Sequence, residues 1–186
     1  MQPVRFLPAV VGLALALMST TIYLATPDAA PLSDKPGTAL AGDADVMFLR
    51  KAAQAGALEI EASRMAEKKA SSAAVKQFAA QMIKDHSAAS AKMEPLAKRL
   101  GVQLPASPPE VQKQELAQMN TLNGAAFDQA YAQKIGVEAH EEAVSLFREA
   151  AKDTKDDGVQ AFARDTLPTL QHHLDMAKKM AGQVRK

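Results

Sequence analysis

The chain has 186 residues, enough for one domain of ordinary size together with an appendage. Its 22 basic and 21 acidic residues nearly balance and form no block of one sign, which argues against a nucleic-acid partner, because phosphate binding requires a concentrated basic face. The absence of cysteine excludes disulfides, thiolate metal sites and a cysteine nucleophile, and the scarcity of aromatic residues favours packed helices over a sheet.

The start of the chain predicts an export signal or a membrane anchor. Residues 6–26 carry no charge and follow a short start containing Arg5. Their apolar centre is short, which favours a signal peptide, but no A-x-A cleavage pattern follows closely, so an uncleaved anchor is the alternative. Residues 1–26 therefore form the signal or anchor, and residues 27–42, rich in Pro, Ala and Gly, a flexible linker. Either way, we expect a bacterial domain in the periplasm or tethered to the inner membrane facing it.

From residue 43 onward, apolar residues recur at the helical period of 3.6, which predicts an all-α domain over residues 43–186. The first helix is expected over residues 44–70, with Asp43 as its N-cap. The second is expected over residues 73–100, where Gly101 stops it. Pro95 lies inside the second helix and is expected to kink its last turns.

Two further long helices follow a long link. The third is expected from about Ala125 to the loop before residue 157, and the fourth over residues 157–182, with Pro168 bending or splitting it. The link over residues 101–124 carries a short fifth helix, which begins after Ser107 and reaches about Leu122.

The loops limit the topology. Short turns join the first helix to the second and the third to the fourth, so each pair must form an antiparallel hairpin. A long crossover between two such hairpins is the ferritin-like arrangement, and an up-down-up-down bundle is the alternative. The expected fold is an all-α, ferritin-like four-helix bundle with a short extra helix in its crossover, preceded by an N-terminal hydrophobic segment.

Each long helix places one polar residue on its apolar seam. These residues are Glu59, His86, His140 and His173. Each lies near the middle of its helix. With a helical rise of 1.5 Å per residue, their positions along the bundle axis therefore differ by no more than about 9 Å in either topology. Three neutral imidazoles and one carboxylate can hold a single zinc, copper or iron ion, so these four are the candidate metal ligands. Asp85 and Tyr131 are the expected outer partners of the histidines.

A self-satisfied hydrogen-bond network is the plainer interpretation of the same four residues, and the sequence leans towards it. Buried polar groups must be paired, and such a network fixes the register of packed helices. A di-iron centre is not expected, because that site needs Glu-x-x-His on two helices. The residues three before the seam histidines are Ile83, Val137 and Leu170. His172 falls on another face and is expected to be exposed.

Several short motifs occur in order along the domain. They are GALE at 56–59, VKQFAAQMIKDH at 75–86, GAAFDQAY at 124–131 and LPTLQHHL at 167–174, together with the histidine at 140. The pattern resembles a bacterial ferritin-like family of unknown function, whose members are often labelled predicted outer-membrane or putative membrane proteins. The resemblance implies an exported bundle and adds Asp128 to the polar positions named above. It implies no reaction.

The sequence therefore predicts an exported helical bundle of unassigned activity, structural or stress-related, with a buried Glu/His cluster. It leans against an enzyme and names no protein partner, and it is compatible with a dimer. One alternative is a periplasmic protein that binds a transition-metal ion through the cluster. Another is a metal-dependent enzyme, which would need an open coordination position and a cleft that reaches the cluster.

Overall fold

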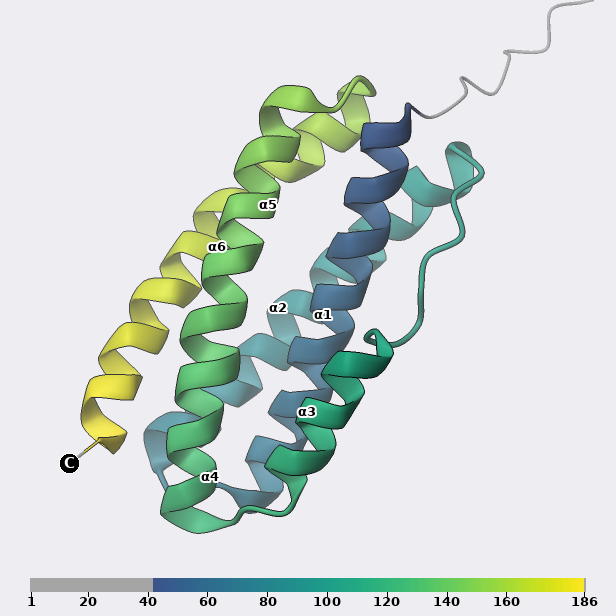
Figure 1. The fold of residues 1–186 in the computed structure, drawn as a ribbon. Coiled ribbons are helices and arrows are strands. Elements are labelled where there is room, and N and C mark those ends of the chain that lie inside the picture. The colour runs from purple at the N-terminus through teal and green to yellow at the C-terminus, as the bar shows by residue number, and fades with distance from the viewer. Residues whose placement is uncertain (1–41, 186) are drawn as a thin grey trace, which may run out of the picture. The chain divides into compact units, whose positions relative to one another are not determined.

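Figure 1 shows the computed structural model of the protein, which describes residues 42–185. The predictions of a signal or anchor over residues 1–26 and of a linker before residue 42 lie outside the described residues. Within them the chain is all-helical, as predicted. The elements are α1 (Asp43–Lys69), α2 (Ala73–Arg99), α3 (Glu110–Asn120), α4 (Gly124–Tyr131), the π-helical segment η1 (Ala132–Glu138), α5 (Ala139–Asp153) and α6 (Asp157–Val184). None of the described helices combines the length and the apolar character that a membrane crossing requires.

The helix ends follow local side-chain chemistry. Ser72 caps α2 by accepting a hydrogen bond from the backbone N–H of Val75, and Asp156 caps α6 by accepting from Val159 N–H. Gly101, at φ 65°, follows the end of α2 in the left-handed region that favours glycine. The sequence predicts Asp43 as the N-cap of α1, but the N-cap is Gly42. The side chain of Asp45 reaches back and accepts a hydrogen bond from Gly42 N–H, which begins the helix one residue earlier.

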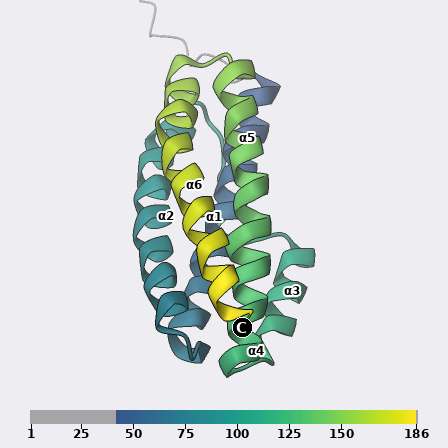
Figure 2. The same cartoon turned by 90° about the vertical axis from the view of Figure 1, so that its left-hand side faces the viewer.

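Pro168 does not split the last helix. α6 runs without a break from Asp157 to Val184 with Pro168 inside it and exposed to solvent. Similarly, α4, η1 and α5 follow one another without a gap and form the third long helical rod. The described chain therefore consists of four long rods and the short α3, as Figure 2 shows from one side.

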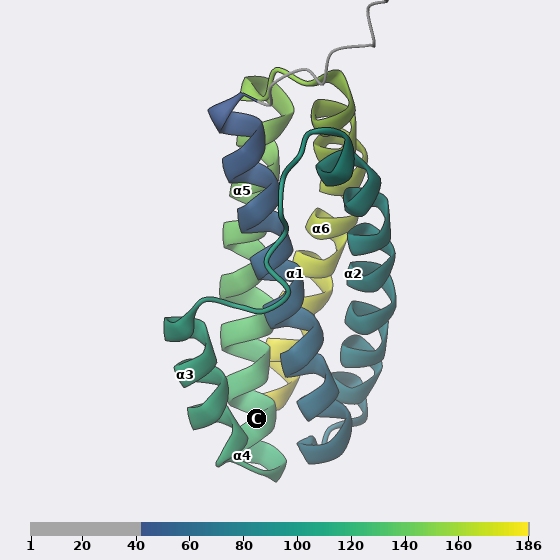
Figure 3. The same cartoon turned by 90° about the vertical axis from the view of Figure 1, so that its right-hand side faces the viewer.

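The rods pack in a square, with α1 against α2 and α5, and α6 against α5 and α2. The α5–α6 turn contacts the start of α1, and Arg99 at the end of α2 binds Asp156 in the same turn, with N···O distances of 2.6 and 2.7 Å. Thus α2 and α5 end at the same end of the bundle and run parallel. The link between them returns along α1 to α3 (Figure 3), and an up-down-up-down order does not fit.

The core is divided into two apolar clusters along the bundle. One lies at the end where α1 begins and includes Phe48, Phe147 and Phe162. The other lies at the opposite end and includes Phe78 and Phe127. On each of the four rods, the polar residue predicted on the seam falls where one apolar cluster gives way to the other.

A buried aspartate joins the two hairpins at each end of the bundle. Asp45 in α1 accepts from the backbone N–H groups of Lys155 and Asp156 in the α5–α6 turn. Asp128 in α4 accepts from the backbone N–H groups of Ser71 and Ser72 in the α1–α2 turn, and from the Ser71 hydroxyl. Each carboxylate thereby supplies acceptors for a turn that belongs to the other hairpin.

We expect the substitution Asp128→Ala to lower the free energy of unfolding by roughly 1–2 kcal/mol, because three donors lose their acceptor and only part of that loss is recovered by water. Urea unfolding followed by circular dichroism measures the change. The exposed Asp165 provides the matched control, Asp165→Ala. Equal stability of the two variants would contradict a clamping role for Asp128.

Candidate metal centre

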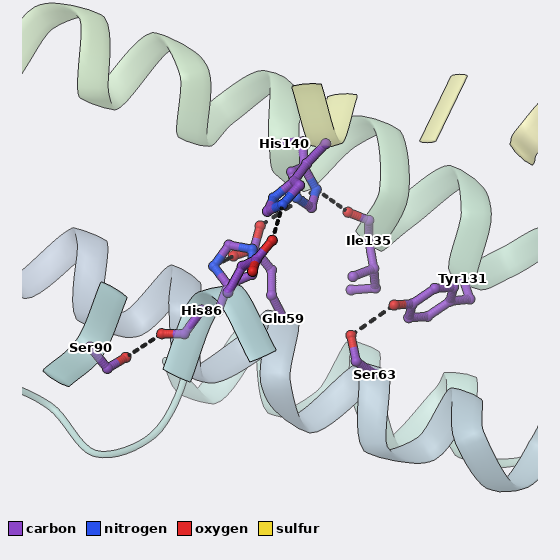
Figure 4. Close-up of polar contacts among 9 residues, drawn as sticks. Glu59, Ser63, His86, Ser90, Tyr131, Ile135 and His140 are labelled. Carbon is purple, nitrogen blue, oxygen red and sulfur yellow. Dashed lines mark hydrogen bonds and ion pairs between the residues drawn. The ribbon is translucent and has the colours of Figure 1, made fainter. Parts of the chain in front are cut away.

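The four seam residues converge in the middle of the bundle. Glu59 comes from α1, His86 from α2, His140 from the first turn of α5 and His173 from α6. All four are buried, with exposures of 1, 7, 0 and 1% respectively. The ring centroids of the three histidines form a nearly equilateral triangle with sides of 5.5–5.7 Å. Figure 4 shows Glu59, His86 and His140 pointing toward one another from their separate helices.

Each histidine has one ring nitrogen within hydrogen-bond distance of an acceptor. His86 Nδ1 lies 3.0 Å from Glu59 Oε2, and His140 Nδ1 lies 2.9 Å from the carbonyl oxygen of Ile135. His173 Nε2 lies 2.8 Å from Asp85 Oδ2. A carbonyl or carboxylate oxygen can only accept, so these three nitrogens carry the hydrogen, and the network assigns the tautomer of each neutral ring.

The other nitrogen of each ring is buried and has no hydrogen-bond partner among the described residues. These atoms are His86 Nε2, His140 Nε2 and His173 Nδ1. The three histidines can each offer a ring nitrogen such that all three atoms lie within 4.8 Å of one another. Metal-binding histidines commonly have this pattern, with the outer N–H donated to a carboxylate or carbonyl and the inner lone pair free.

The π-helical segment η1 makes the acceptor for His140 available. In a π-helix the backbone bonds lengthen by one residue, and Ala139 N–H accordingly donates to Lys134 and not to Ile135. The Ile135 carbonyl can therefore accept from the His140 ring (Figure 4). A Cβ on Gly136 would stand only 3.2 Å from that of Ala177, so this glycine lets α6 approach one turn from His173.

The acceptor on His173 is itself supported. Gln81 donates from Nε2 to Asp85 Oδ2 at 2.6 Å, one turn earlier on α2. Burial alone would raise the pKa of the Asp85 carboxyl, but hydrogen bonds from Gln81 and His173 lower it below its ordinary value. Asp85 is thus held as an anion and oriented toward α6, away from its chain neighbour His86.

The buried charges divide unequally among the cluster. Burial opposes the ionisation of Glu59, but His86 and His140 lower the pKa of its carboxyl below the ordinary value. Burial likewise opposes a charge on His86, yet the Glu59 carboxylate raises the pKa of His86. Burial lowers the pKa of His173 to about 4, so this ring is neutral at pH 7. The shifts of Glu59 and His86 thus favour the charged form of both groups when no metal ion is bound.

A small cavity adjoins the cluster on the side toward the start of α1. It measures about 20 Å³, which is enough for one water molecule, and Glu59 and His86 form part of its wall. Small residues from three helices, including Ala55, Gly56 and Ala143, leave this space. On the other side of the cluster, by contrast, the ring of Phe78 packs against His140 with centroids 5.9 Å apart.

The other residues singled out in the sequence lie elsewhere. Asp128 binds the α1–α2 turn and makes no hydrogen bond to the described cluster residues. The Tyr131 hydroxyl bonds to Ser63 at 2.7 Å, and its ring packs on Phe78. His172 is exposed, as expected. Sequence reasoning missed Ile135, Gln81 and η1, and the only signal for η1 is Gly136, an isolated glycine inside a helical pattern.

The fold and the cluster define a class: an all-helical bundle whose four rods each contribute one buried Glu or His. The chain belongs to the family described as "Domain of unknown function (DUF4142)", which matches residues 29–180. No curated protein matches the chain. Among solved structures, it is similar to the crystal structure of a DUF305 fragment from Deinococcus radiodurans, with a TM-score of 0.66 and 18% identity, covering 77% of this chain and 98% of that one. At this identity the likeness extends to the fold alone.

The lowered pKa of His173 makes a prediction for the metal-free protein. As the pH falls, His173 takes up a proton near pH 6.5 in the unfolded state but only near pH 4 in the folded state. The contribution of neutral His173 to the free energy of unfolding is therefore complete above pH 6.5 and is lost as the pH falls toward 4. The loss amounts to at most about 3 kcal/mol. We expect urea unfolding in the presence of a chelator to show a steeper decline in stability over this range for the parent than for His173→Gln. The exposed neighbour provides the control, His172→Gln, and a parallel decline in all three proteins would contradict the assignment.

Proposed function

We propose that this protein is an exported, ferritin-like helical bundle that binds a single divalent transition-metal ion through His86, His140 and His173. One observation carries the proposal: three histidines from three helices can each offer a ring nitrogen within 4.8 Å of the other two, and each ring keeps one buried nitrogen without a hydrogen-bond partner among the described residues. An unpaired buried polar atom costs about 1–3 kcal/mol, and a bound ion would satisfy all three at once.

The donor set fits zinc, copper or iron. Imidazole nitrogen is a common ligand of each of these metals, and the chain offers no thiolate that would favour a softer site. A tetrahedral zinc ion with Zn–N bonds of about 2.0–2.1 Å holds its nitrogens about 3.3 Å apart. The three rings can each offer one nitrogen within 4.8 Å of the other two, so drawing these atoms onto an ion needs side-chain movements of about an ångström.

The charges of the site also suit a divalent ion. Both Glu59 and Asp85 have pKa values lowered by their partners and are anionic at neutral pH. Because the three imidazoles are neutral, the two negative charges of these carboxylates would balance the charge of a bound dication. Glu59 faces the hydrogen-bearing Nδ1 of His86, so we assign it to orienting that ring, although the sequence makes it one of four candidate ligands.

Export and the ferritin-like classification belong to the same proposal. The uncharged residues 6–26 support export to the periplasm, by a cleaved signal or with a membrane tether. The two hairpins joined by a long returning crossover support the ferritin-like topology. The function we favour is storage or delivery of the ion, in a structural or stress-related setting.

A self-contained hydrogen-bond network is the second candidate. The short contact between Glu59 and His86 favours it, since a proton on His86 makes this an ion pair that needs no metal. On that hypothesis the cluster fixes helix register and the protein acts through partners. Metal-dependent catalysis is a third hypothesis, and the cavity of about 20 Å³ restricts it to substrates no larger than water or a diatomic molecule.

Metal content separates these candidates. We expect residues 43–186, purified without a histidine tag or chelator, to hold about one metal ion per chain by elemental mass spectrometry. His86→Ala, His140→Ala and His173→Ala should each lose it, because two imidazoles leave too few ligands for a structural site. His172→Ala, altered one position away on the exposed face, should retain it. No metal in the parent, even after soaking with zinc, copper and iron, would reject the proposal in favour of the network.

The two carboxylates should affect the affinity for the ion without acting as its ligands. We expect Glu59→Gln and Asp85→Asn to weaken binding of zinc by about 10–100-fold, the usual effect of removing the acceptor behind a ligating histidine. Competition with a chromogenic chelator measures the affinity. Glu138→Gln alters a carboxylate that pairs with Lys134 on the surface and serves as the control. Complete loss of zinc in Glu59→Gln alone would instead make Glu59 a fourth ligand.

A further inference from the structure

The cavity beside the cluster shares wall residues with two surface grooves, one at each of two helix seams. It shares Ser90 and Met93 with a groove of about 600 Å³ between α1, α2 and residues 104–106 of the crossover. It shares Ala55 and Ala143 with a second groove, of about 440 Å³, between α1, α5 and α3. Each groove is a candidate path by which an ion could reach the buried histidines.

Charge does not discriminate between the two grooves. Glu61, Glu94 and Arg64 line the groove on the α2 side. Glu142, Glu149 and Lys51 line the groove on the α5 side. Each therefore presents two carboxylates and one cation, and each attracts a metal ion to a similar extent.

The side chains that close the seams differ in their freedom to move. On the α5 side the shared residues are alanines, whose methyl groups are fixed to the helix backbone, so the path opens only if α1 and α5 separate. On the α2 side the closing side chains are Met93, which has three rotatable bonds, and Ser90. Opposite them stands Gly56, where an added Cβ would meet only Ser90 Oγ, at 3.8 Å. The Ser90 hydroxyl donates to the His86 carbonyl oxygen at 2.9 Å, so this seam opens by rotation of the Met93 side chain, without separation of the helices.

We infer that metal ions reach the three histidines through the seam between α1 and α2, over Gly56 and past Ser90 and Met93. This inference rests on the proposed metal site and names its access route. His86, Ser90 and Met93 lie at positions i, i+4 and i+7 on one face of α2, so an ion that passes Met93 and Ser90 arrives at the first of the three ligands.

The test introduces valine at each of two neighbouring residues of α1. Gly56→Val adds a side chain to the proposed route, and Ala55→Val adds one to the competing route on the α5 side. Metal-free residues 43–186 and each variant are mixed with cobalt(II) in a stopped-flow instrument, and the absorbance of the bound ion gives the uptake rate. Circular dichroism verifies that each variant is folded, and Gly56→Ala provides a milder block. Equilibrium titration gives the final occupancy.

We expect Gly56→Val to slow uptake at least about tenfold, an added barrier of about 1.4 kcal/mol, with Gly56→Ala intermediate, Ala55→Val near the parent rate and occupancy unchanged in all. Slower uptake only in Ala55→Val would overturn the inference in favour of the α5 side. Equal rates, or equal slowing, in the two valine variants would also overturn it. Failure of the parent itself to bind cobalt, zinc or copper would instead reject the metal site, and the route with it.

Discussion

The burial of Glu59 is the constraint on which the rest of the structure depends. An ionised carboxylate in the middle of an apolar bundle is unfavourable by several kcal/mol unless charges and hydrogen bonds compensate for it. Here the compensation comes from other helices: His86 Nδ1 of α2 lies 3.0 Å from one oxygen, and His140 Nδ1 of α5 lies 3.6 Å from the other, which is beyond hydrogen-bond distance. Sliding any of these helices by one turn, about 5.4 Å, would leave the charge unpaired. The cluster therefore specifies which arrangement of the helices is native.

Apolar packing alone would specify that arrangement poorly. The seams are rich in alanine, and seams of small, similar residues pack almost equally well in several registers. Polar contacts at both ends and in the middle of the bundle select one register. Asp45 ties α1 to the α5–α6 turn at one end, Asp128 ties α4 to the α1–α2 turn at the other, and the Glu/His cluster joins all four rods between them. The histidines are thus held from both ends of the bundle, and their geometry is set before any ligand binds.

The sequence predicts the helices, the two hairpins and the four seam residues, because helical period, caps and loop lengths are local properties. It does not predict what the seam residues bind. Asp85 adjoins His86 in the chain, yet it contacts His173, because its position on α2 turns it toward α6. Asp128 shares a helix with Tyr131 but serves a distant turn. The π-helical segment is least predictable, since it depends on the close approach of α6 to Gly136 and on the ring of His140, and both belong to the tertiary structure.

The direction of the three imidazoles bears on what the cluster is for. In a network that satisfies itself, the rings would donate to and accept from one another. Here every ring donates to a group other than a histidine, namely Glu59, Asp85 or the Ile135 carbonyl, and the remaining nitrogen of each ring is buried without a hydrogen-bond partner among the described residues. Neutral rings in these tautomers leave three lone pairs without a donor, and one added proton on His86 can be shared with only one neighbour at a time. At least one nitrogen then stays unpaired at a cost of about 1–3 kcal/mol, whereas a cation among the three is bound by all of them.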